Sequence, residues 1–195
     1  MKQLMMYHKM DVIRPSKRPL PEGYTLRTYR PGIGDEEAWV EISKCGIINP
    51  ASGVEAFTRS IAERPGVIPE NDTFFVCRPD GTPGATLTAF KRPNGEGEIH
   101  MVTAMADMRG FGVGQIMLCH GMQHIDALMG DEKKVTELTT DDWRLPAIVG
   151  YLREGFHPVL YDEKMEERWR KVAWEIGMHG IEFLDMEGNG TGIIL

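Results

Sequence analysis

The sequence is short of cysteine and of long hydrophobic runs. Cys45, Cys77 and Cys119 are its only cysteines, and they lie far apart in 195 residues. That spacing indicates neither a disulfide framework nor a paired-cysteine metal site, so we expect a reducing, cytoplasmic location. No apolar run approaches the ~18 residues of a membrane span. Residues 1–9 lack the apolar core of a secretory signal, so we expect neither export nor membrane binding.

Basic residues are also scarce relative to acidic ones. The 22 lysines and arginines face 29 aspartates and glutamates, which gives a net charge of −7. General nucleic-acid binding requires a basic face, so we expect no nucleic-acid partner. A cationic or amine substrate is compatible with this charge. The hydrophobic fraction of 42% and the charged fraction of 26% are ordinary for a globular protein.

Two common nucleotide-binding motifs are missing as well. A dinucleotide fingerprint G-x-G-x-x-G would need a glycine at position 115 or 117, where the chain has Gln115 and Met117. The Gly-Lys-Ser/Thr triplet of an NTPase phosphate loop does not occur. What is present is the glycine-rich run 109–114, between a strand-like segment (98–104) and an expected helix (115–128). Free amides and the helix macrodipole attract anions there, and glycines let a phosphate approach, so this run predicts a phosphate site.

The same run fits a third pattern, (Gln/Arg)-x-x-Gly-x-(Gly/Ala), through Arg109, Gly112 and Gly114. A second block, 139–148 leading into Tyr-x-x-x-Gly-Phe at 151–156, follows at the right distance. Together the two blocks resemble the GNAT superfamily of acyl-CoA-dependent N-acetyltransferases. The resemblance is good from about 71 to 160 and rests on element order alone before that. The second block is similar to a bacterial branch that includes mycothiol-synthase-like proteins, whose chains often hold two repeats.

The expected elements follow the order of that superfamily. Strands are expected at 24–29, 73–77, 85–90, 98–104 and 134–139, with a last strand after the second block. Helices are expected at 36–45, 52–62 and 115–128, and a short one within the second block ends at Tyr-x-x-x-Gly-Phe. The resemblance implies an α/β (α+β) fold with a mixed, mostly antiparallel central sheet and helices on both faces. We expect one domain over 1–195, with a core at about 22–160. The extension 161–195 holds a further amphipathic helix at 162–176, which covers the substrate side or packs against a second subunit of a homodimer.

The resemblance implies acetyl-CoA as co-substrate, and the positions of the family motif indicate which residues would bind it. Backbone groups of one strand would lie beside the pantetheine arm, and the glycine loop would bind the pyrophosphate. The strand residues are Val102, Thr103 and Ala104; the loop residues are Arg109, Gly110, Phe111, Gly112, Val113, Gly114 and Gln115. Arg144 stands where many members have an asparagine that contacts the arm, and its alternative is a helix-surface arginine.

Catalysis needs an acid for the leaving thiolate and a base for the amine. Tyr151 occupies the family's position for the acid, and a phenol with a pKa of about 10 is protonated at neutral pH. Its alternative is a half-buried structural aromatic. Glu98 occupies a family position for the base, acting through water; Glu96 and His100 share its face. Thr139 fills another base position and cannot serve, so the base stays open.

Two further patterns are expected to carry no chemistry. His120 and His124 have the i, i+4 spacing of zinc ligands, but Gly121 replaces the glutamate of the protease motif and no third ligand is evident. We therefore expect no metal. Asp141 and Asp142 precede the short helix, where we expect them to act as N-caps.

The leading interpretation is an N-acetyltransferase that moves an acetyl group from acetyl-CoA to a primary amine by direct attack. The amine would belong to a small molecule or a peptide. No cysteine lies in either block, so an acyl-enzyme is not indicated. One alternative is a non-catalytic acyl-CoA-binding sensor or interaction module, and another is a phosphate binder without coenzyme A. The acceptor stays open, because residues 35–66 carry no recognisable motif.

Overall fold

A computed structural model describes residues 2–132 and 134–194. Its contacts group the chain into two compact units. We call residues 13–132 the glycine-loop unit, and residues 2–12 with 134–194 the tyrosine unit. This grouping does not test the expectation of a single domain over 1–195, which stays a prediction.

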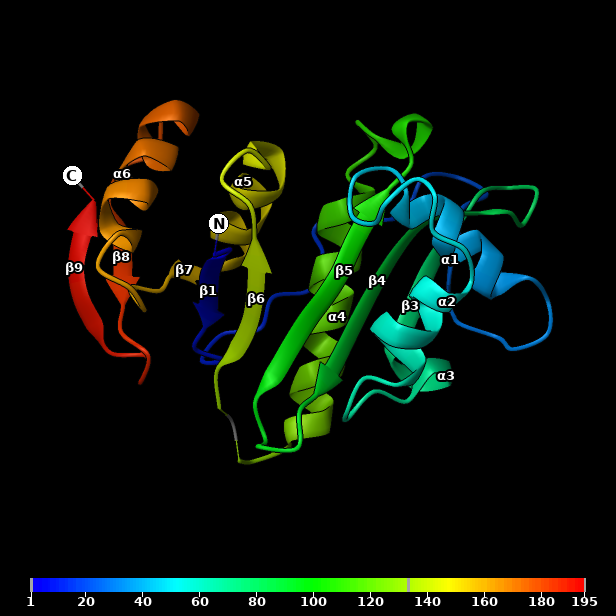
Figure 1. Ribbon diagram of the computed structural model, residues 1–195, viewed down its shortest axis with the longest axis horizontal. Helices are drawn as coiled ribbons and strands as arrows, with labels where there is room; N and C mark the ends of the chain where they lie inside the picture. The colour runs from blue at the N-terminus through cyan, green and yellow to red at the C-terminus, as the bar shows by residue number, and fades with distance from the viewer. Residues whose placement is uncertain (1, 133, 195) are drawn as a thin grey trace. The chain divides into compact units, whose positions relative to one another are not determined.

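The glycine-loop unit contains four strands and the helices that pack on them (Figure 1). In chain order its elements are β2 (Thr25–Thr28), α1 (Asp35–Ser43), α2 (Glu55–Phe57), the π-helical turn η1 (Thr58–Ala62), α3 (Pro69–Asp72), β3 (Thr73–Cys77), β4 (Pro83–Lys91), β5 (Gly97–Ala104), the 3₁₀ turn η2 (Ala106–Met108) and α4 (Val113–Met129). The strands pair in the order β2-β3-β4-β5, each pair antiparallel. The expected hairpin at 73–90 is therefore confirmed.

Side-chain alternation along β3 explains why helices cover both faces of these strands. The ring of Phe74 meets His120 and His124 of α4 edge-on, at 4.8 and 5.2 Å between centroids. The next residue, Phe75, belongs to the hydrophobic cluster that contains Trp39 of α1. Because successive side chains of a strand point to opposite faces, α1 and α4 lie on opposite sides, as Figure 1 shows.

One glycine lets α4 lie close to the strands. A Cβ added at Gly121 would lie 2.8 Å from Leu87 Cδ2, 3.1 Å from Ala89 Cβ and 3.2 Å from Ile99 Cδ1. Real Cβ atoms do not approach this closely without a shift of their neighbours. The glycine that breaks the zinc-protease motif therefore has a packing role.

The tyrosine unit contains the second motif block and the chain's two ends. Its elements are β1 (Leu4–His8), β6 (Thr136–Thr140), α5 (Leu145–Glu154), β7 (His157–Pro158), α6 (Met165–Ile176), β8 (Ile181–Leu184) and β9 (Gly190–Ile194). β1 lies between β6 and β7 and pairs antiparallel with both. β8 and β9 form a separate hairpin.

The fold class is confirmed: both units combine helices with mostly antiparallel strands, which gives the expected mixed α/β fold. Four details differ from the sequence prediction. The helix expected at 52–62 begins at Glu55 and winds as a π-helix from Thr58. α3 was not expected, and neither was β1, because its methionine-rich run Leu4–His8 lacks the β-branched residues that favour strands. The extension helix begins at Met165 instead of 162.

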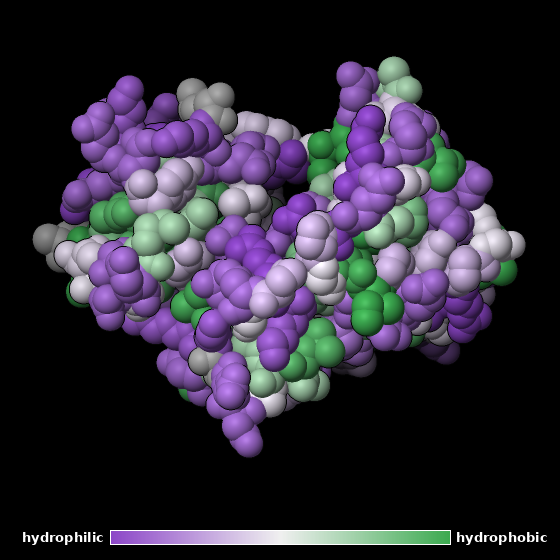
Figure 2. Space-filling model, turned by 60° about the horizontal axis from the view of Figure 1, so that its bottom comes forward, coloured by the Kyte–Doolittle hydropathy of each residue, from purple (hydrophilic) through white to green (hydrophobic). Residues whose placement is uncertain are grey.

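The surface is mixed in character. On the face that Figure 2 shows, hydrophobic residues appear in separate small patches among hydrophilic ones, as on most proteins. None of the helices in the described part of the chain is long and apolar enough to cross a membrane.

Candidate active site

The glycine loop has the backbone conformation that its glycines permit. Gly110 has φ = 85° and Gly112 has φ = 75°, in the left-handed region that other residues adopt at a cost. Gly112 is the N-cap of α4, so the helix begins at Val113, two residues before the expected start. Gly114 therefore lies in the first turn of the helix, and Arg109, Gly110 and Phe111 are exposed in front of it.

The N-terminus of α4 is suited to an anion. Within 2–132 and 134–194, no side chain caps this helix by a hydrogen bond and no acidic residue occurs in its first turn. By contrast, α1 carries Asp35, Glu36 and Glu37 in its first turn. A helix of 17 residues without a carboxylate in its first turn leaves its positive end and its first amides to a ligand.

The strand before the loop contains a β-bulge. Thr86 pairs with Thr103 and Thr88 with His100, so one residue of β4 faces two of β5, Met101 and Val102. Met101 has φ = 53°, which a non-glycine residue rarely adopts. Bulges of this kind are frequent beside active sites. No glycine or proline marks this one in the sequence.

The bulge also divides β5 into two halves by burial. Gly97, Glu98 and Ile99 are buried, whereas every residue from His100 to Ala104 is half-buried. The residues expected beside the pantetheine arm, Val102, Thr103 and Ala104, all lie in the accessible half. Their contact with a cofactor stays a prediction.

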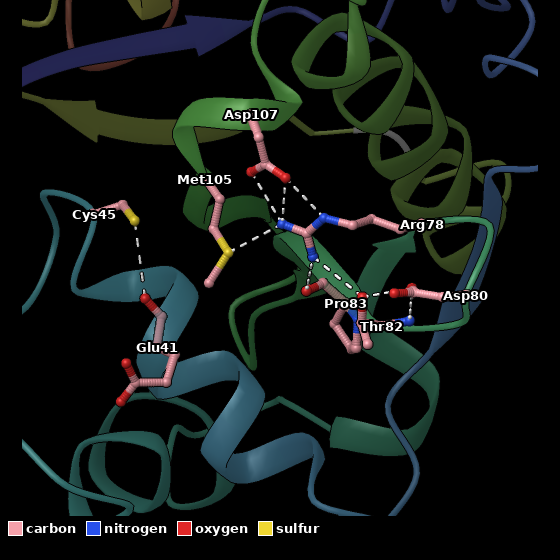
Figure 3. Close-up of polar contacts among 8 residues, drawn as sticks. All are labelled: Glu41, Cys45, Arg78, Asp80, Thr82, Pro83, Met105 and Asp107. Atoms are coloured by element: carbon pink, nitrogen blue, oxygen red, sulfur yellow. Dashed lines mark hydrogen bonds and ion pairs between the residues drawn. The ribbon is translucent and has the colours of Figure 1, made fainter.

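Arg78 fixes the segment between β5 and the glycine loop (Figure 3). Its Nε donates to Asp107 Oδ2 at 2.8 Å, and its Nη2 donates to Asp107 Oδ1 at 3.0 Å and to Met105 Sδ at 3.3 Å. Nη1 donates to the carbonyl of Pro83 at 2.9 Å. One guanidinium thus joins the β3–β4 turn to the residues that lead into the loop. The sequence did not indicate this set of hydrogen bonds, which we call the Arg78 cluster, because Arg78 and Asp107 are 29 residues apart.

Glu98 lies in a buried ionic cluster. Its side chain is 6% exposed; Oε1 accepts a hydrogen bond from Arg64, and Oε2 accepts one from Arg92 Nε at 2.6 Å. His100 Nδ1 is 3.4 Å from Oε1. Two guanidinium groups therefore share one carboxylate, which gives Glu98 a structural role. Its role as a base stays a prediction.

His100 has a perturbed pKa. Burial, followed by the nearby Arg64 charge, lowers the pKa of His100 to about 4. The ring is therefore neutral at neutral pH.

Tyr151 lies on α5 in the tyrosine unit. It is 9% exposed, and its ring packs edge-on against Phe156 with the centroids 6.1 Å apart. Burial raises the pKa of Tyr151 to about 12, against a smaller opposing effect of Arg144. The phenol is therefore protonated at neutral pH, as an acid must be before it donates.

The spacing of the Tyr-x-x-x-Gly-Phe block is explained by the end of α5. Gly155 caps the helix with φ = 104°, and the N–H of Phe156 donates to the carbonyl of Tyr151 at 3.0 Å. A Cβ at Gly155 would lie 3.1 Å from His8 Nε2 of β1. The Tyr-x-x-x-Gly-Phe block therefore ends α5 where it packs closely against β1.

The residues before α5 do not cap it as expected. Asp141 Oδ2 accepts from Arg144 Nε at 2.8 Å, and Asp142 pairs with Arg168 of α6. The N-cap position itself is held by Arg144, which makes no side-chain cap and stacks on the Trp143 ring at 4.4 Å. The N-cap prediction for both aspartates was wrong, because arginines compete for their carboxylates. Contact between Arg144 and a cofactor stays a prediction.

His120 and His124 pack against Phe74, and His124 also makes a polar contact. Besides their contacts with Phe74, His124 Nε2 lies 2.8 Å from Asp72 Oδ1. In the described residues, no group of three or more metal-binding side chains comes together.

The chain is similar in sequence to known proteins. The sequence profile of the acetyltransferase (GNAT) family matches residues 45–156, which includes the glycine loop and all of α5. A mycothiol acetyltransferase of Streptomyces bingchenggensis is 30% identical over 141 residues, 70% of this chain and 44% of that protein. A mycothiol acetyltransferase of Streptomyces griseus is 25% identical over 164 residues, 78% of this chain and 52% of that protein. The chain thus spans about half the length of these relatives.

The fold has solved counterparts. A GCN5-related N-acetyltransferase from Sphaerobacter thermophilus aligns with a TM-score of 0.59 at 22% identity, over 80% of this chain and 48% of that one. At this identity the likeness concerns the fold. The profile match covers more than half of the chain and includes the glycine loop described above. The chain therefore belongs to the acetyltransferase (GNAT) family of acyltransferase enzymes.

Proposed function

We propose that this protein is an N-acetyltransferase that uses acetyl-CoA to acetylate a primary amine. Members of its family generally use acetyl-CoA. The observation that carries the proposal for this chain is the start of α4, which has left-handed glycines in front of it and, in the part of the chain that the structure describes, no acid in its first turn. These features fit a diphosphate, because backbone amides are open to it and no carboxylate in the first turn of the helix opposes it.

Each predicted binding residue has a distinct task in this proposal. The amides from Gly110 to Gln115 bind the diphosphate, with Arg109 and Phe111 exposed beside it. The backbone of Val102, Thr103 and Ala104, in the accessible half of β5, pairs with the pantetheine arm, and Arg144 contacts the same arm. When bound, acetyl-CoA supplies the activated acetyl group that the amine attacks.

Proton transfer is assigned to Tyr151 and Glu98. Tyr151 holds a proton for the departing sulfur, and its raised pKa keeps that proton in place over the neutral range. Glu98 receives a proton from the amine through water. The two arginines on Glu98 keep its carboxylate fixed in one orientation.

The acceptor is a small-molecule amine in this proposal. The two curated relatives carry the name mycothiol acetyltransferase, which favours a small molecule over a peptide. The net charge of −7 suits an acceptor that arrives as an ammonium ion.

The test is a comparison of Tyr151→Phe with wild type in an assay of thiol release from acetyl-CoA, run against a panel of small amines. We expect kcat to fall about 100-fold or more while acetyl-CoA affinity changes less than about twofold, since the lost group acts only in proton transfer. Tyr161→Phe is the control, because that tyrosine lies in the same unit and donates to the Gln3 carbonyl. A Tyr151→Phe enzyme with full turnover would remove the acid role.

A further inference from the structure

A segment outside both motif blocks brings a positive charge to the glycine loop. Residues 13–24 precede β2 and belong to the glycine-loop unit. A Cβ built on Gly112 would lie 3.8 Å from both Cδ and Nη1 of Arg18. The Arg18 guanidinium therefore lies beside the residue that caps α4.

The segment is held in this place by further contacts. The Tyr24 ring lies 6.3 Å from the Phe111 ring of the loop, between centroids. Ser16 Oγ donates to the Arg18 carbonyl at 2.8 Å and accepts from the Arg18 N–H at 3.2 Å. Prolines at 15, 19 and 21 restrict the backbone around it. Arg18 is thus presented by a constrained segment and not by a free tail.

This placement is electrostatically unfavourable without an anion. The N-terminus of α4 carries the positive end of the helix macrodipole, and a cation close to it is repelled. Within residues 2–132 and 134–194, no carboxylate pairs with the Arg18 guanidinium, although acidic residues outnumber basic ones in the chain. Two positive features that lie side by side fit a ligand that carries negative charge.

We infer that Arg18 is a phosphate ligand of the cofactor, and that residues 13–24 complete the cofactor site. The inference rests on the proposed function. Acetyl-CoA carries phosphate in its diphosphate and at the 3′ position of its ribose, and either group suits a guanidinium. A charge-assisted hydrogen bond formed equally in every bound state strengthens binding and leaves the chemical step unchanged.

The experiment measures the affinity of acetyl-CoA by calorimetry for wild type, Arg18→Gln, Arg18→Lys and Lys17→Gln. Lys17 is the matched control, since it carries the same charge on the same segment and is also exposed. We expect Arg18→Gln to weaken binding about 10-fold or more and to make it less sensitive to salt. Arg18→Lys should recover part of the loss, and Lys17→Gln should change the affinity less than about twofold. In turnover, Arg18→Gln should raise KM for acetyl-CoA and leave kcat unchanged.

A second arm identifies the phosphate. Titration with 3′-dephospho-CoA assigns Arg18 to the diphosphate if Arg18→Gln weakens that ligand as much as CoA, and to the 3′-phosphate if the loss is confined to CoA. Both results support the inference. It is overturned if Arg18→Gln binds like wild type, or if Lys17→Gln loses as much affinity. Failure of wild type to bind acetyl-CoA would instead remove the proposed function together with this inference.

Discussion

At the residue scale, the two side chains proposed for proton transfer have opposite surroundings. Tyr151 is buried against Phe156, and burial keeps it neutral, whereas Glu98 is held by the charges of Arg64 and Arg92. A carboxylate with both oxygens in ion pairs can reach an amine only through water or His100, whose Nδ1 is 3.4 Å away. In the proposed function, this cluster therefore serves both proton transfer and stability.

The same cluster predicts how stability changes with pH. The pKa of His100 is lowered to about 4 in the folded protein, against about 6.5 in an unfolded chain. Between these values the unfolded state binds a proton that the folded state does not, so stability should fall as the pH drops from about 6.5 to 4, by at most about 3 kcal/mol from this group. Urea unfolding of wild type and His100→Gln at several pH values measures this loss of stability.

The matched control for that series is His179→Gln, a change at an exposed histidine. His100→Gln should flatten the acid side of the stability profile, and His179→Gln should leave it unchanged. Profiles of equal slope for wild type and His100→Gln would show that His100 titrates alike in both states.

Individual residues differ in how far the sequence could predict them. The glycines of the loop and Tyr151 could be proposed as site residues from the sequence, because local motifs of fixed spacing carry them. The partners of Glu98 could not, since Arg64 is 34 residues away and nothing in the sequence connects the two. Arg18 was missed for the same reason.

At the element scale, the positions of the long periodic elements could be predicted and their irregularities could not. The β5 bulge at Met101 depends on the register with β4, and η1 depends on how its turn packs. β1 was missed because a run of five residues has too little pattern to indicate a strand that neighbours on both sides stabilise.

The hydrogen bonds of the Arg78 cluster give a prediction at this scale. Arg78→Ala should raise KM for acetyl-CoA about 10-fold, with a smaller effect on kcat, because the segment from Met105 to Asp107 no longer holds the loop against the β3–β4 turn. Arg78→Lys should recover only part of this, since lysine cannot make the two-pronged contact with Asp107.

The control for this change is Arg170→Ala, which removes an exposed arginine paired with Glu166 on α6. It should alter neither constant, because exposed pairs of this kind contribute little. If Arg78→Ala kept the wild-type KM for acetyl-CoA, the hydrogen bonds of the Arg78 cluster would not contribute to the position of the glycine loop.

At the scale of the whole molecule, the fold class and the family follow from two short blocks in register, and the acceptor does not. Acceptor recognition depends on side chains gathered from several loops, for which the sequence contains no common motif. The chain also spans about half the length of the relatives it matches, 44% and 52%. What those proteins do as whole molecules is therefore carried to this chain as a proposal.

The most direct test of the central claim is a calorimetric titration of acetyl-CoA into wild type and Gly112→Asp, with NAD and ATP as comparators. We predict that wild type binds acetyl-CoA in preference to both. We expect Gly112→Asp to lose about 10-fold or more, because its carboxylate occupies the anion site at the start of α4. Gly32→Asp is the control, a glycine of similar φ (76°) with no atom within 4 Å of an added Cβ. A folded wild type that does not bind acetyl-CoA, or a Gly112→Asp variant that binds it equally well, would contradict the account.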